Sequence, residues 1–80
     1  MAEMYLTELQ QGEEAVIIEI LGGRGLKDRL NALGLGEGQR IRKLAKVGWH
    51  GPVILVVNRA QIAIGRGMAR KIVVKTNGNG

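Results

Sequence analysis

LKDRLNALGLGEG, residues 26–38, is the stretch that decides the fold of this chain. Leu26, Leu30 and Leu33 recur at i, i+4 and i+7, a spacing that places them along one stripe of a helix. Gly34 follows at once, where the end of a helix needs a residue that tolerates a left-handed backbone. Leu35 can then fold back onto the stripe, and a glycine-rich turn leads on toward a strand. The stretch predicts one short helix that ends abruptly and buries its three leucines.

Outside this helix the chain has the pattern of short strands separated by glycine-rich turns. Strands are expected at residues 14–20, 39–47, 53–57, 61–64 and 70–75. In the first, Val16, Ile18 and Ile20 are expected to share one face, which Glu14 joins at the solvent end. The run 53–57 is continuously apolar, so we expect it to be the central strand, buried on both sides.

A break in one strand and the segments between the strands carry further signals. Ile41 and Lys43 share a face, but the apolar Leu44 then breaks the alternation, which predicts a bulge near Arg42 or Lys43. Composition predicts a turn at 48–52, a tight reversal at Asn58-Arg59 and a single helical turn at 65–69. If the last strand pairs with the first, the five expected strands form a small, partly open SH3-like barrel. The expected fold class is all-β, with one short helix that caps an end of the barrel.

Length and composition limit the class of protein. Eighty residues predict a single domain, 1–80, with an ordered part of about 4–75 and a flexible tail at 76–80. The chain has no Cys, which rules out disulfides and favours a reducing compartment. No apolar run approaches the roughly 20 residues that span a bilayer, and the N-terminus lacks the features of a signal peptide. These features predict a cytoplasmic protein.

The net charge of +5 implies an acidic partner or simply good solubility. One hypothesis is a barrel that binds nucleic acid through its basic residues. The residues concerned are Arg40, Arg42, Lys43, Lys46 and Lys71. Such barrels usually stack bases on surface aromatic side chains, and this chain offers only Trp49 and Tyr5. The shortage of aromatic residues argues against nucleic acid as the partner.

The residue types needed for catalysis or metal binding do not gather in the sequence. His50 is the single histidine, Ser and Cys are absent, and the acidic residues are scattered. A transition-metal site normally needs several converging ligands, and nucleophilic catalysis needs a nucleophile beside a base. We therefore predict no catalytic residue, no metal site, no cofactor and no enzyme activity.

Three motifs together resemble the FeoA family: RLNALGLGEG at 29–38, GPV at 51–53 and ARKIVV at 69–74. The resemblance runs from about Tyr5 to Lys75 and implies an SH3-like barrel. It also implies a small cytosolic protein that accompanies the bacterial ferrous-iron transporter FeoB. Such a protein would bind the GTPase-bearing part of FeoB at the inner face of the membrane and modulate iron uptake. The same fold occurs as the carboxy-terminal domain of iron-dependent repressors.

Contacts with such a partner are expected on the loops of the barrel. The predicted contact residues are Trp49, His50 and Pro52 in the turn, with Arg24, Lys27 and Arg29 around the helix start as an electrostatic rim. Trp49 has two interpretations: its ring caps the aliphatic core, or it stands out as an interface anchor, a role in which Trp is enriched. Self-association through the strand 53–57 or an open edge of the barrel is a further hypothesis.

Overall fold

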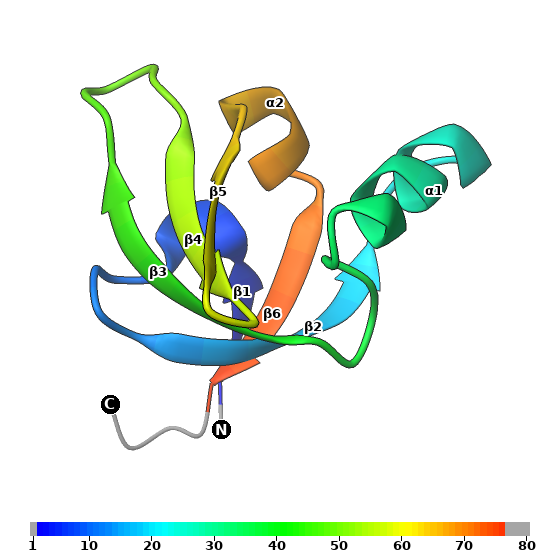
Figure 1. The fold of residues 1–80 in the computed structure, drawn as a ribbon, viewed down its shortest axis with the longest axis horizontal. Helices are drawn as coiled ribbons and strands as arrows, with labels where there is room; N and C mark the ends of the chain where they lie inside the picture. The colour runs from blue at the N-terminus through cyan, green and yellow to red at the C-terminus, as the bar shows by residue number, and fades with distance from the viewer. Residues whose placement is uncertain (1, 77–80) are drawn as a thin grey trace.

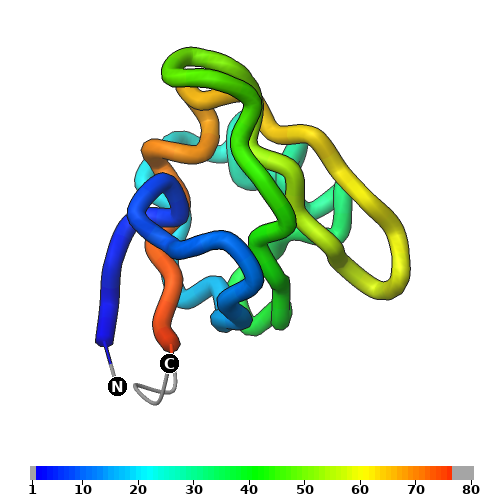
Figure 2. Tube along the Cα trace, turned by 90° about the vertical axis from the view of Figure 1, so that its left-hand side faces the viewer, coloured from blue at the N-terminus to red at the C-terminus, as the bar shows by residue number. Residues whose placement is uncertain are grey.

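Strands far apart in the sequence pair to make a curled antiparallel sheet. The computed structural model describes residues 2–76. The elements in chain order are β1 (Ala2–Tyr5), the 3-10 turn η1 (Leu6–Glu8), β2 (Glu14–Ile20), α1 (Arg24–Ala32), β3 (Arg40–Lys46), β4 (Val53–Val57), β5 (Ala60–Ile64), α2 (Arg66–Ala69) and β6 (Ile72–Thr76). The strand order is β1-β6-β2-β3-β4-β5, which leaves β1 and β5 as outer strands (Figure 1). Figure 2 shows the chain curling round the space that the core side chains fill.

The expected all-β, partly open barrel is confirmed, but its sheet has six strands where five were predicted. The additional strand is β1, which pairs with β6 from Ala2 opposite Thr76 to Tyr5 opposite Val73. Three of its four residues are exposed, so it carries no alternating pattern that the sequence could reveal. Thr76 is part of β6 and only 5% exposed, so the prediction of a tail from this residue was wrong. The rest of the predicted tail, 77–80, lies outside the described residues.

The end of α1 is stabilised as the glycine predicted. Gly34 has a φ of +84°, and its N–H donates to the Asn31 carbonyl at 3.0 Å. The Leu35 N–H donates to the Leu30 carbonyl at 2.8 Å, and both leucine side chains are fully buried. This pair of hydrogen bonds with its apolar contact is a Schellman motif. The motif sends the chain from the helix directly back to the barrel.

The prediction that all three helix leucines are buried was wrong. Leu30 is fully buried, Leu26 packs partly against the core, and Leu33 is 39% exposed. Figure 1 shows the reason, because α1 projects from one side of the barrel instead of closing its mouth. The barrel therefore covers only the part of the apolar stripe of α1 that lies beside Leu35.

Two bulges decide which side chains face the core. The pairing of β2 with β6 shifts register between Ile17 and Glu19, so the buried residues of β2 are Ala15, Ile17 and Ile20. The prediction that Val16, Ile18 and Ile20 share one face was wrong, because the extra residue of the bulge puts Ile20 among the buried residues while Val16 and Ile18 are half-buried. In β3 the shift lies between Lys43 and Ala45, directly after the predicted bulge position.

The prediction that residues 53–57 are buried on both sides was also wrong. Val53, Leu55 and Val57 are buried, whereas Ile54 and Val56 are half-buried. β4 lies next to the outer strand β5, and within residues 2–76 no second layer covers its outer face. The tight reversal that follows is confirmed, since Asn58 and Arg59 have φ values of 50° and 70°. This geometry is that of a two-residue hairpin loop.

Candidate interaction surfaces

The loop between β3 and β4, residues 47–52, is shaped by its own backbone; we call it the Trp49 loop. The Val47 N–H donates to the Pro52 carbonyl at 3.0 Å and closes the loop. Gly48 has a φ of +63°. A Cβ on Gly51 would overlap the carbonyl oxygen of Val47, so this position requires glycine. The two glycines therefore allow a tight turn that carries Trp49 and His50 at its tip.

Trp49 stands out from the barrel with 83% of its surface exposed. The Nζ atom of Lys46 lies 5.3 Å from the centroid of its ring, within the range of a cation–π contact. Since the ring covers none of the aliphatic core, the interpretation of Trp49 as a cap of the barrel was wrong. His50 is exposed beside it, and Pro52 is half-buried at the base of the loop. The loop thus presents a large apolar side chain with a cation over its face.

The three basic residues predicted as a rim lie on α1 and are all exposed. Arg24 opens the helix, whereas Arg29 lies in its last turn, so the three residues span the helix and do not surround its start. Figure 1 places α1 and the Trp49 loop toward opposite ends of the longest axis of the molecule. The six predicted contact residues therefore form two separate surfaces.

Lys43, one of the residues of the nucleic-acid hypothesis, is not on the surface. It is 4% exposed, and its Nζ donates to the carbonyl oxygens of Leu9 at 2.6 Å and Thr7 at 3.2 Å. Burial lowers the pKa of Lys43, and repulsion from Lys46 and Arg66 lowers it further. The side chain ties η1 to β3 and is unavailable to a partner. Its shared face with the buried Ile41 was the signal for this position in the sequence.

Arg66, on the short helix α2, belongs to a basic cluster in the sequence but was not among the predicted contact residues. Its Nε and Nη2 atoms are buried and have no hydrogen-bond partner. The guanidinium lies near enough to Lys43 to affect the pKa of that amine. Two cations, Lys43 and Arg66, therefore lie close together near η1, and both have buried polar atoms. Hydrogen bonds offset the desolvation cost of the Lys43 amine, whereas the Arg66 Nε and Nη2 have no such compensation.

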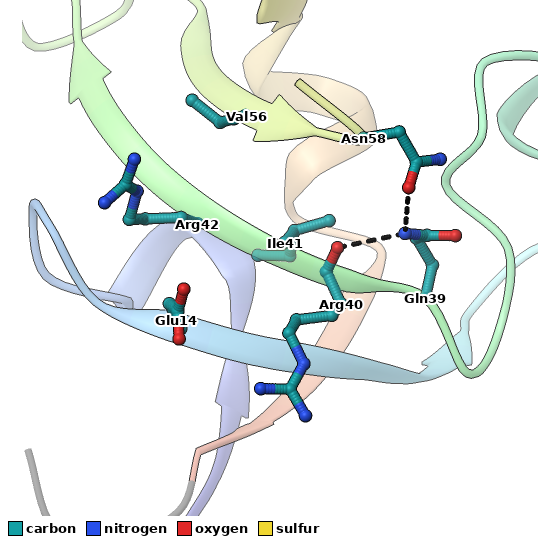
Figure 3. A pocket seen from close by; sticks show the side chains of 7 residues that line it. All are labelled: Glu14, Gln39, Arg40, Ile41, Arg42, Val56 and Asn58. Atoms are coloured by element: carbon teal, nitrogen blue, oxygen red, sulfur yellow. Dashed lines mark hydrogen bonds between the residues drawn. The ribbon is translucent and has the colours of Figure 1, made fainter. Parts of the chain in front are cut away.

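A depression of about 300 Å³ lies on the outer side of the sheet across β2, β3 and the end of β4. Its lining residues are Glu14, Gln39, Arg40, Ile41, Arg42, Val56 and Asn58 (Figure 3). The Gln39 Nε2 donates to the Arg40 carbonyl at 3.1 Å and to the Asn58 Oδ1 at 3.5 Å. We call this the Arg40–Arg42 depression. Sequence reasoning placed both arginines in a basic cluster but could not assemble their neighbours from three separate strands.

Within residues 2–76, no three or more His, Cys, Asp or Glu side chains gather as a metal ion would require. Across the same residues, no helix has the length and apolar character to cross a membrane.

Comparison with protein families and curated proteins gives a consistent result. The family model of the FeoA domain matches residues 4–76. A curated relative, the "Putative Fe(2+) transport protein A" of Methanocaldococcus jannaschii, is 37% identical over 73 residues. The match spans 90% of this chain and 87% of the relative.

Solved structures agree on the fold. A crystal structure described as an iron uptake regulatory protein (FeoA) superposes with a TM-score of 0.85 at 31% identity, over 94% of this chain and 97% of that one. A manganese-dependent transcriptional repressor gives a TM-score of 0.83 at 19% identity, over 92% of this chain and 41% of the repressor. The repressor shows likeness of fold alone, and the match confirms that this barrel also occurs as part of longer chains.

Proposed function

This chain belongs to the FeoA family, and on that premise we propose that it is a non-catalytic accessory protein of ferrous-iron uptake. Its partner in this proposal is the cytosolic, GTPase-bearing part of a FeoB-type transporter, which it binds and regulates. It would act in the cytoplasm, at the inner face of the membrane through that partner. The names of its relatives, which refer to Fe(2+) transport and to regulation of iron uptake, support this assignment.

The observation that carries the proposal is the exposure of Trp49. A tryptophan that stays in water on a closed loop contributes little to the fold, yet its large apolar ring can supply binding energy when a partner covers it. The adjacent Lys46 adds a cation at the edge of the same surface. The exposed His50 and the half-buried Pro52 of the same loop would add to this contact.

The basic residues of α1 would serve as a second, electrostatic contact with the same partner. Exposed charges at the rim of an interface change the association rate and its salt dependence more than the affinity. Arg24, Lys27 and Arg29 lie far from the Trp49 loop, so one partner contacts both only if it extends along the barrel. Because Lys27 would be one of these rim charges, its reversal should slow association with the partner and make the association rate depend less on salt concentration.

The test is a titration of an immobilised GTPase-bearing domain of FeoB with this chain, in the GDP-bound and GTP-analogue-bound states. Trp49→Ala should weaken binding by about 30-fold, the loss typical of an interface hot spot. Tyr5→Ala is the matched control, because Tyr5 is the other aromatic residue, 46% exposed, on β1. Absence of binding in every nucleotide state would refute the proposal, and an equal loss in both variants would remove the role of Trp49.

Two alternatives are tested with the same samples. The nucleic-acid hypothesis loses one of its five contacts with the burial of Lys43. Binding of an oligonucleotide at micromolar affinity, with a steep salt dependence, would favour the nucleic-acid hypothesis over the transporter proposal. Light scattering of the purified chain tests self-association, for which the outer strands β1 and β5 supply unpaired edges.

A further inference from the structure

We propose that the Arg40–Arg42 depression is a docking site for an extended acidic segment of a protein partner, whose carboxylates pair with the two arginines. The inference does not depend on which protein supplies the segment. It concerns a different surface from the Trp49 loop, so either proposal can fail while the other stands.

Strand register places the two arginines side by side on the outer face. Arg42 lies opposite Glu14 of β2 on one side and Val56 of β4 on the other. Arg40 is two residues away along β3, opposite Val16, which in turn lies opposite Lys75 of β6. Side chains at i and i+2 of a strand point to the same face and are about 7 Å apart. The face thus carries two arginines two residues apart along β3, whose guanidinium groups extend to either side of that strand, with a third cation two strands away.

Arg40 and Arg42 have no anionic partner among the described residues. Within residues 2–76, neither Arg40 nor Arg42 forms an ion pair, although Glu14 belongs to the same face. Figure 3 shows the two guanidinium groups extending to opposite sides of β3, with the Glu14 carboxylate beside them. One carboxylate cannot neutralise two guanidinium groups, so the depression has an excess of positive charge. An anionic group that enters gains charge-assisted hydrogen bonds.

The remaining lining residues also favour a ligand that accepts hydrogen bonds. The Asn58 Oδ1 accepts a hydrogen bond from Gln39, while the Asn58 amide nitrogen has no acceptor among the described residues. The half-buried Val56 adds an apolar side chain to the lining. Donors from Arg40, Arg42 and Asn58 beside an apolar side chain suit a segment that carries both carboxylates and an apolar side chain.

The shape and spacing identify the segment as an extended polypeptide. The depression is open and shallow, whereas sites for small molecules enclose most of their ligand. In an extended segment, alternate side chains recur at about 7 Å, which matches the spacing of Arg40 and Arg42. Nucleic acid fits less well because neither Trp49 nor Tyr5 lines the depression, so bases have no ring on which to stack. The expected ligand therefore carries acidic residues at alternate positions.

The test is a titration of the ¹⁵N-labelled chain with a capped Gly-Glu-Val-Glu-Gly peptide, followed by backbone amide shifts. The amides of Arg40, Arg42 and Asn58 should shift, with a Kd in the millimolar range or tighter. A Gly-Gln-Val-Gln-Gly peptide should leave them unchanged. The double variant Arg40→Gln, Arg42→Gln should bind the acidic peptide about tenfold more weakly.

The matched control is Arg70→Gln, Lys71→Gln, which removes the same charge from two other exposed positions. It should change the affinity by less than about threefold, because the net field is weaker than specific pairing. An equal loss of affinity in both double variants would show that the peptide responds to net charge alone, and it would overturn the proposal. So would shifts confined to other surfaces, or tighter binding of oligothymidylate at the same amides. Trp49→Ala should bind the peptide like the unchanged chain, which separates this test from that of the proposed function.

Discussion

Replacing Lys43 by methionine is expected to lower the free energy of unfolding by about 2–4 kcal/mol. The Lys43 side chain is 4% exposed, and its Nζ donates to the Leu9 carbonyl at 2.6 Å and the Thr7 carbonyl at 3.2 Å. Methionine keeps most of the apolar stem but removes the donor. Each buried acceptor left without a partner costs about 1–3 kcal/mol, and relief from burying a cation returns part of this.

That loss is large for a chain of this size. A domain of 80 residues has a free energy of unfolding of roughly 4–12 kcal/mol. At about 4–8 °C per kcal/mol, the melting temperature should fall by roughly 10–30 °C. The effect should be concentrated where Lys43 joins two elements, so the backbone amides of η1 should lose hydrogen-exchange protection before those of the central strands.

The assay is urea unfolding followed by far-UV circular dichroism, with Lys71→Met as the control. Lys71 is exposed, so the same chemical change there should cost less than about 0.5 kcal/mol. A loss below that value for Lys43→Met would refute the reasoning, because it would mean that the two carbonyl oxygens do not depend on the buried amine.

Burial lowers the pKa of Lys43 below its ordinary 10.5. At a pH between the lowered pKa and 10.5 the unfolded chain binds more protons than the folded chain, so the contribution of Lys43 to the free energy of unfolding increases as pH rises. The difference in unfolding free energy between the unchanged chain and Lys43→Met should grow over that window, and a constant or shrinking difference would contradict it. Gly34→Ala should cost about 1–2 kcal/mol in urea unfolding, since alanine is strained at a φ of +84°; an unchanged midpoint would argue against the left-handed helix end. Arg59→Gly should stabilise by about 0.5–1 kcal/mol, because Arg59 has a φ of 70° in a hairpin loop where Asn-Gly is preferred, and a lower melting temperature would disprove this. Arg66→Met should leave stability unchanged or raise it by about 1 kcal/mol, because it removes buried donors that have no partner; a clear loss on calorimetry would show that the guanidinium is satisfied.

Features set by local backbone chemistry could be predicted from the sequence. The helix end at Gly34 and the reversal at Asn58-Arg59 depend on residues adjacent in the chain, and the structure has both. The inner face of β2 could not be predicted, because its bulge arises from pairing with β6, at the other end of the sequence. β1 was missed for the same reason, since its only partner strand is also β6.

The candidate surfaces also divide into those that neighbouring residues indicate and those that only the folded sheet brings together. Exposure of Trp49 was one of two interpretations that the sequence left open, since a lone aromatic in a glycine-flanked turn suits either. Lys43 was placed with the surface cations because of its charge, although its alternation with Ile41 indicated the interior. The Arg40–Arg42 depression combines side chains from β2, β3 and the end of β4, so only the assembled sheet reveals it.

The pairing of Ala2 with Thr76 has a topological consequence. Ala2 and Thr76, the two ends of the described residues, lie together at one corner, while the loop between β3 and β4 lies at the opposite end of the view in Figure 1. A unit with this geometry can be inserted between two segments of a larger protein without forcing them apart. Labels or fusion partners attached at that corner would leave the Trp49 loop accessible.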